Sequence, residues 1–91
     1  MILVKNATGT SQWPTPSTGE SSWLEYWKKH RTGSGTVKCG SCGSTSDLVG
    51  AHVKKAFGGN ELYITPLCSR CNQKKESFYV DSELVRVPSG L

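Results

Sequence analysis

Four cysteines, arranged as two pairs, are the residues whose type and spacing point most directly to chemistry. Cys39 and Cys42 form one Cys-x-x-Cys pair, Cys68 and Cys71 form the other, and 25 residues separate them. Two residues between paired cysteines let both thiolates reach one ion from a single turn, and four thiolates in a tetrahedron suit zinc. Such a closed site is structural because it leaves no position for a catalytic water. The sequence therefore predicts one structural Zn²⁺ ion.

Disulfides, a redox pair and an iron cluster are the competing interpretations of the same cysteines. The apolar run at the amino terminus, Met1 to Val4, is too short for a signal peptide, and no other run approaches the length of a membrane span. We therefore expect a cytoplasmic protein without a membrane partner. In that compartment disulfides are rare and paired cysteines more often hold a metal ion, while iron remains the main competitor for soft thiolates.

The length of 91 residues allows at most one domain with a modest core. Domains of this size often need a metal ion or disulfides to be stable, so we expect zinc binding to be part of folding. The net charge of +4 and the pI of about 9.0 permit binding to nucleic acid or to an anionic surface. The same charge also suits an ordinary solvated surface.

The first half of the chain contains one predicted helix. Within residues 1–20 the stretch "GTSQWPTPSTGE" is rich in proline, glycine and hydroxyl residues. We expect residues 1–20 to be poorly ordered or to form an edge element, with Trp13 folding back on the core. Residues 21–91 form the single domain. In "SSWLEYWKKHR" Ser22 and the residue three positions on form a capping box, and Trp23 and Trp27 belong to an apolar stripe. Core packing is favoured for these tryptophans over a base-stacking platform.

The second half alternates turn signals with apolar segments. "DLVGAHVKKAF" and "ELYITPL" predict two strands of a hairpin that bends near residues 58–60. "CSRCNQKKESF" predicts a helix that starts at the second cysteine pair, and "YVDSELVRVP" predicts an extended segment or short strand. A zinc knuckle, a hairpin and a helix in this order form a treble-clef core. The predicted fold is a small α+β zinc-binding domain with this core and an additional N-terminal helix.

The segment 39–75 resembles the HNH endonuclease family, whose catalytic unit is a ββα-metal motif. The residues that carry the resemblance are "CGSCG", "AHV", the glycine pair and "PLCSRCNQKK". The resemblance implies that His52 is the general base that deprotonates the attacking water. It also implies that Asn72 holds a catalytic divalent ion such as Mg²⁺. An imidazole titrates near neutral pH, and a bound metal would stabilise the leaving oxygen of a phosphodiester.

Two positions depart from the family pattern. Ala51 stands where many members have a metal ligand, and Tyr63 falls near the position of the asparagine that buttresses the base. We therefore expect a zinc-binding, HNH-like, nucleic-acid-binding module, with DNA as the partner, whose nuclease activity is weakened or lost. An active divalent-metal-dependent endonuclease that cuts DNA and a zinc-stapled protein-interaction module are the alternatives. Five basic residues are expected either to contact phosphates or to form a solubilising face: Lys54, Lys55, Arg70, Lys74 and Lys75.

Overall fold

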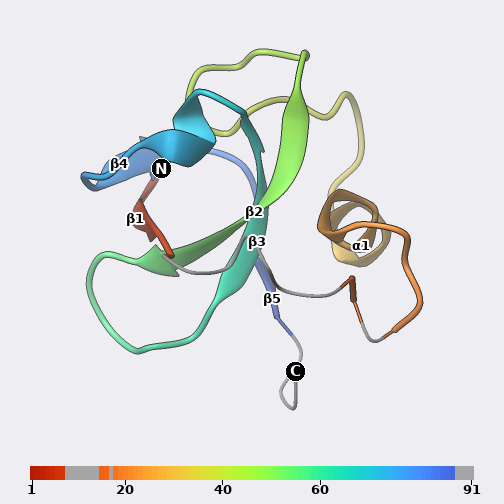
Figure 1. The fold of residues 1–91 in the computed structure, drawn as a ribbon, viewed down its shortest axis with the longest axis horizontal. Coiled ribbons are helices and arrows are strands. Elements are labelled where there is room, and N and C mark those ends of the chain that lie inside the picture. Colours follow the sequence, from red (N-terminus) through yellow and green to blue (C-terminus); the bar gives the residue numbers. More distant parts are fainter. Residues whose placement is uncertain (8–14, 17, 88–91) are drawn as a thin grey trace.

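A computed structural model describes residues 1–7, 15–16 and 18–87, and within them the chain forms a small α+β domain built on one antiparallel sheet (Figure 1). The helical elements are α1 (Trp23–His30) and a short 3₁₀ helix, η1 (Cys71–Gln73). The strands are β1 (Ile2–Asn6), β2 (Leu48–Lys55), β3 (Tyr63–Cys68), β4 (Phe78–Val80) and β5 (Val85–Arg86). Trp13 lies outside the described residues.

The sheet order is β4-β1-β2-β3-β5, and every pairing is antiparallel. The predicted hairpin is present, because residues 48–53 of β2 pair with all six residues of β3. The expectation that the first residues are poorly ordered or lie at an edge is wrong for 2–6: β1 is an interior strand between β4 and β2. The reason is non-local, since Val4 is fully buried between Phe78 and Lys55, its partners on the two neighbouring strands.

The predicted N-terminal helix is confirmed as α1. The Ser22 side chain accepts a hydrogen bond from the backbone amide of Glu25, which is the N-cap half of the predicted capping box, while the Glu25 carboxylate pairs with Lys28. Trp23 and Trp27 are buried, so the core-packing interpretation holds for both. Two side-chain hydrogen bonds join this helix to the last strand region: Tyr26 donates to the carbonyl of Arg86, and the Trp27 indole donates to that of Glu83.

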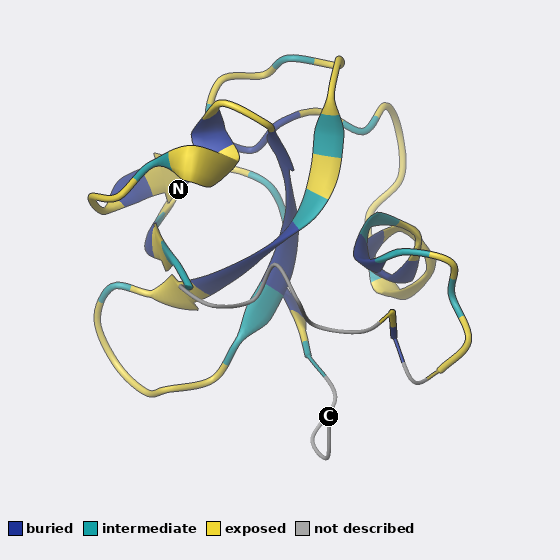
Figure 2. Ribbon diagram, in the orientation of Figure 1, coloured by how far each residue is buried: buried dark blue, intermediate teal, exposed yellow. Residues whose placement is uncertain are grey.

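Two apolar clusters form the core, and they lie on opposite sides of the β2–β3 hairpin (Figures 1 and 2). The first, which we call the cysteine-side cluster, contains Ala51 and Val53 together with three of the cysteines, and η1 closes it. The second, which we call the tryptophan cluster, contains Ile64 and the buried aromatic side chains of α1. Neighbouring residues of a strand point to opposite faces, so this one hairpin contributes to both clusters. Among the described residues, no helix is long and apolar enough to cross a membrane.

The helix expected after the second cysteine pair does not form, and η1 stands in its place. Its hydrogen bonds run from Gln73 to Arg70 and from Lys74 to Cys71, the i to i+3 pattern of a 3₁₀ turn. Lys74 then adopts an extended conformation, and the chain continues into β4, which pairs with β1. Pairing with a distant strand has overridden local helix propensity. The described residues therefore contain one α-helix, and they lack the long second helix of a treble clef.

Candidate functional site

The four cysteines come together at one end of the sheet. Their sulfur atoms all lie within 4.8 Å of one another. A tetrahedral ion with Zn–S bonds of about 2.3 Å needs sulfurs about 3.8 Å apart. The Cys42 and Cys68 sulfurs are 3.7 Å apart, and all four thiols are free of disulfides. The cluster can therefore hold one metal ion such as zinc, and its four-sulfur donor set fits a structural ion.

Backbone geometry builds the first half of this cluster. Gly43 donates a backbone hydrogen bond to the Cys39 carbonyl and takes a φ of 81°, a conformation that glycine adopts without strain. Burial raises the pKa of the Cys39 thiol, but backbone hydrogen bonds, first from Cys42 and Cys68, outweigh burial and lower it to about 6. Burial also raises the pKa of Cys71, to about 12. Full thiolate formation here thus requires a cation that replaces the protons.

Asn6 and Lys74 support the second half of the cluster, and sequence reasoning missed the role of Asn6. Its side-chain amide donates to the carbonyls of Cys71 and Lys74, at 3.1 and 3.0 Å, and so ties η1 to β1. The Lys74 ammonium donates to the Ser41 hydroxyl at 2.9 Å and lies 5.0 Å from the centre of the Phe78 ring. A cation at this position would offset part of the negative charge of a tetrathiolate site. The role of Asn6 depends on the contact between β1 and η1, which joins residues 65 positions apart in the sequence. A local sequence pattern does not reveal this contact.

His52 lies in the contact between β2 and α1. Its side chain is only 7% exposed, and its ring packs edge-on against Trp23 with the ring centres 5.0 Å apart. Its cross-strand partner is Ile64, which belongs to the tryptophan cluster. Burial lowers the pKa of His52 from 6.5 to about 4, so the imidazole is neutral at pH 7. A group with this pKa is a weak general base at neutral pH.

The structure does not bring His52 and Asn72 together. Asn72 is exposed on η1, and η1 closes the cysteine-side cluster, whereas His52 lies under α1 on the other side of the hairpin (Figure 1). Ala51 points into the cysteine-side cluster, so a ligand at that position would not face His52 either. Tyr63 is half-buried beneath the Lys55 ammonium, 5.0 Å from its ring centre. These positions do not converge on one ion.

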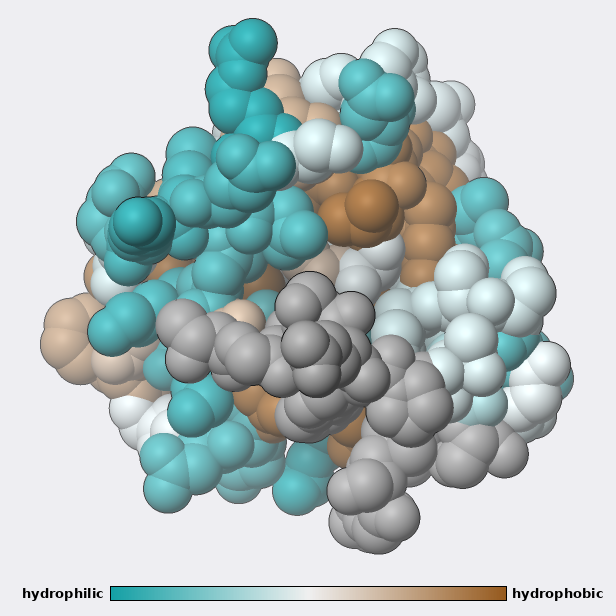
Figure 3. Space-filling view, viewed as in Figure 1, coloured by the Kyte–Doolittle hydropathy of each residue, from teal (hydrophilic) through white to brown (hydrophobic). Residues whose placement is uncertain are grey.

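The basic residues separate into two groups by their partners. In the described part of the chain every salt bridge involves α1, where Lys28 contacts Glu25 and Lys29 contacts Glu20. His30, which forms an ion pair only when protonated, lies 3.8 Å from the same Glu20 carboxylate. The five predicted phosphate contacts, Lys54, Lys55, Arg70, Lys74 and Lys75, make no salt bridge to a described carboxylate. Figure 3 shows hydrophilic side chains gathered over η1. The cations of the sheet and of the cysteine turns are thus not neutralised within the described residues.

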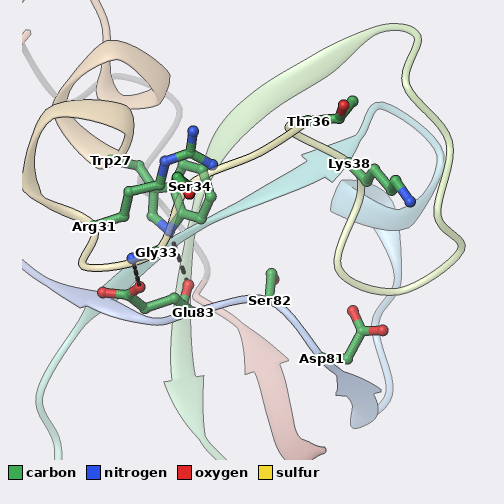
Figure 4. A pocket seen from close by; sticks show the side chains of 9 residues that line it. All are labelled: Trp27, Arg31, Gly33, Ser34, Thr36, Lys38, Asp81, Ser82 and Glu83. Carbon is green, nitrogen blue, oxygen red and sulfur yellow. Dashed lines mark hydrogen bonds between the residues drawn. The ribbon is translucent and has the colours of Figure 1, made fainter.

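A pocket of about 290 Å³ lies beyond the end of α1 (Figure 4). Glu83 organises it: its carboxylate accepts hydrogen bonds from the backbone amides of Thr32 and Gly33. These bonds lower the pKa of the Glu83 carboxyl, with the Thr32 amide as the main cause. The Arg31 guanidinium lies over the Trp27 ring, 5.1 Å from its centre. The pocket contains none of the predicted site residues, and its contacts serve to fasten α1 to the β4–β5 connection.

Comparison with known proteins finds no match: no family model, no curated protein and no solved structure is significantly similar to this chain. The site must therefore be interpreted from its own geometry.

Proposed function

We propose that this protein is a zinc-stabilised nucleic-acid-binding domain that lacks HNH-type nuclease chemistry. The resemblance of its cysteine and histidine motifs to the HNH family would then concern the metal-binding scaffold and not the reaction. The observation that carries the binding proposal is the distribution of ion pairs. Carboxylates neutralise basic residues of α1, while the cations of the sheet and of the cysteine turns have no described carboxylate partner.

The proposal that the protein lacks nuclease activity rests on the positions of His52 and Asn72. A hydrolytic site needs its general base and its divalent ion on the same substrate phosphate. His52 is buried against Trp23, and Asn72 is exposed on the far side of the hairpin. A phosphodiester could not reach both groups without removal of α1 from β2.

Binding and cutting can be tested together on the zinc-loaded protein. Fluorescence anisotropy with labelled single-stranded and double-stranded oligonucleotides at several salt concentrations reports binding, and plasmid incubation with Mg²⁺, Mn²⁺ or Ni²⁺ reports cutting. We expect the affinity for oligonucleotides to fall as the salt concentration rises, because the binding depends on phosphate contacts. We expect no plasmid cutting that depends on His52, so wild type and His52→Ala should behave alike. Salt-insensitive binding, or the absence of binding to any nucleic acid, would overturn the binding proposal. Divalent-ion-dependent cutting that His52→Ala abolishes would overturn the non-catalytic part.

The protein-interaction alternative loses one of its supports. It would be favoured by an exposed patch at Trp13, Trp23 or Trp27. Trp23 and Trp27 are buried in the contact of α1 with the sheet, and Trp13 lies outside the described residues.

A further inference from the structure

The outer face of β1 carries a cluster of exposed and half-buried side chains that the cysteine site does not use. Val4 points inward, so Leu3 and Lys5 point to the opposite face of the sheet. In the sheet register Leu3 stands directly opposite Tyr79 of β4, and Lys5 stands directly opposite Lys54 of β2. These four residues form two adjacent rows, an apolar row and a lysine row, which we call the β1 face. The helix α1 packs on β2 and β3, beyond the lysine row.

The lysine row is electrostatically unfavourable by itself. Like charges directly opposite each other on neighbouring strands destabilise a sheet. Lys5 and Lys54 are both exposed, and neither forms a salt bridge with a described carboxylate. An anion placed between the two ammonium groups would remove this repulsion. The arrangement is therefore complementary to a phosphate.

The apolar row adds a feature that a simple anion site would not need. The Tyr79 side chain is 56% exposed, although its neighbours on β4, Phe78 and Val80, are buried. An exposed aromatic ring on a sheet, beside cations, is the arrangement on which unpaired bases stack while lysines contact the backbone. Bases within a duplex are already stacked on each other, so this face favours single strands.

We propose that the β1 face binds single-stranded nucleic acid, with a phosphate between Lys5 and Lys54 and a base stacked on Tyr79. This inference rests on the nucleic-acid binding proposed above and deepens it by naming the surface and the form of the ligand. It also identifies Lys5 and Tyr79 as contact residues that the basic motifs did not reveal.

The test compares variants of the full-length, zinc-loaded chain by anisotropy with labelled oligothymidine, oligouridine and a matched duplex. Tyr79→Ala should weaken single-strand binding about tenfold or more, whereas Tyr79→Phe, which keeps the ring, should bind like the wild type. The double variant Lys5→Gln/Lys54→Gln should bind more weakly. The slope of log affinity against log salt concentration should become shallower by about 0.7 to 1.4. Lys28→Gln/Lys29→Gln removes the same charge from α1 and serves as the matched control, with little expected effect. Zinc content and circular dichroism verify that each variant is folded.

A second measurement separates the lysine pair from general folding effects. Without ligand, Lys54→Gln should raise the melting temperature because it relieves the repulsion with Lys5, while the same variant binds more weakly. A variant that loses binding because it unfolds would show the opposite change in melting temperature.

Several results would overturn the inference. If Tyr79→Ala binds like the wild type, or the α1 control loses as much affinity as the lysine pair, the β1 face is not the site, although the protein still binds nucleic acid. Preference for the duplex, or binding to anionic phospholipid vesicles in place of oligonucleotides, would exclude a single-strand site. Absence of all nucleic-acid binding by the wild type would remove the proposed function together with this inference.

Discussion

The imidazole of His52 and the side-chain amide of Asn6 show how position in the fold decides what a polar residue can do. His52 has a residue type suited to proton transfer, yet it packs in the contact between β2 and α1 and is neutral at pH 7. Asn6 belongs to no recognised sequence motif, yet it joins β1 to the η1 turn, which carries Cys71. The first residue therefore belongs to the core, and the second supports the metal site.

Neutral His52 should make the stability of the protein depend on pH. The unfolded chain protonates this residue at an ordinary pKa of 6.5, whereas in the folded protein burial holds the pKa at about 4. The contribution of His52 to stability is thus complete above about pH 6.5 and is lost as the pH falls toward 4. Over this window the fall of the pKa from 6.5 to about 4 corresponds to about 3 kcal/mol, so we expect the zinc-loaded wild type to lose about that much more than His52→Leu in urea unfolding. Parallel losses in the two proteins would show that His52 is accessible to protons in the folded state.

Asn6→Ala should lower the free energy of unfolding by ~1–2 kcal/mol, because it leaves two carbonyls of the η1 turn without a donor. Asn72→Ala is the matched control, since it removes an exposed asparagine from the same turn and should change stability by less than about 0.5 kcal/mol. Denaturant unfolding of the zinc-loaded proteins gives both values. A larger loss for Asn72→Ala than for Asn6→Ala would mean that the turn is held from its exposed side.

At the scale of elements, the contact between α1 and β2 depends on one glycine. A β-carbon on Gly50 would lie 2.4 Å from the backbone of Trp23 and of Leu24, so the helix could not remain in place. We expect Gly50→Ala to destabilise the protein by about 1–3 kcal/mol and to expose the tryptophans of α1 to water. Denaturant unfolding and the red shift of tryptophan fluorescence measure the two effects.

Gly33→Ala provides the control for this substitution. A β-carbon there meets only the Glu83 carboxylate at 3.9 Å, an ordinary contact, so little change is expected. Equal stability of the Gly50 and Gly33 variants would show that α1 does not approach β2 as closely as the structure indicates.

Sequence reasoning succeeded where the signal was local. The N-cap residue Ser22 marks the start of α1, and the Cys-x-x-Cys spacing lets both sulfurs of each pair reach the four-sulfur cluster. It failed where a distant partner decides the outcome. β1 is a strand because β4 and β2 flank it, and the segment after Cys71 extends into β4 to pair with β1 instead of continuing as a helix. The side of the hairpin on which His52 lies is decided by α1, which no motif around the histidine reveals.

At the scale of the whole molecule, a small chain combines two modest apolar clusters with four thiols that lie close enough to share one ion. Three of the four cysteines belong to the cysteine-side cluster, so the metal site and this part of the core are continuous. A domain of this size has a small free energy of unfolding, and metal binding that occurs only in the folded state adds to it. We therefore propose that the chain folds around one zinc ion held by Cys39, Cys42, Cys68 and Cys71.

The experiment that tests this proposal measures the metal content of the purified protein together with far-ultraviolet circular dichroism before and after chelation. We expect one zinc ion per chain, loss of the folded spectrum when a chelator removes the ion, and recovery when zinc is returned. Cys42→Ser should bind zinc more weakly and unfold at a lower chelator concentration. A protein that keeps the same spectrum without metal, or that contains iron or disulfides in place of zinc, would contradict the claim.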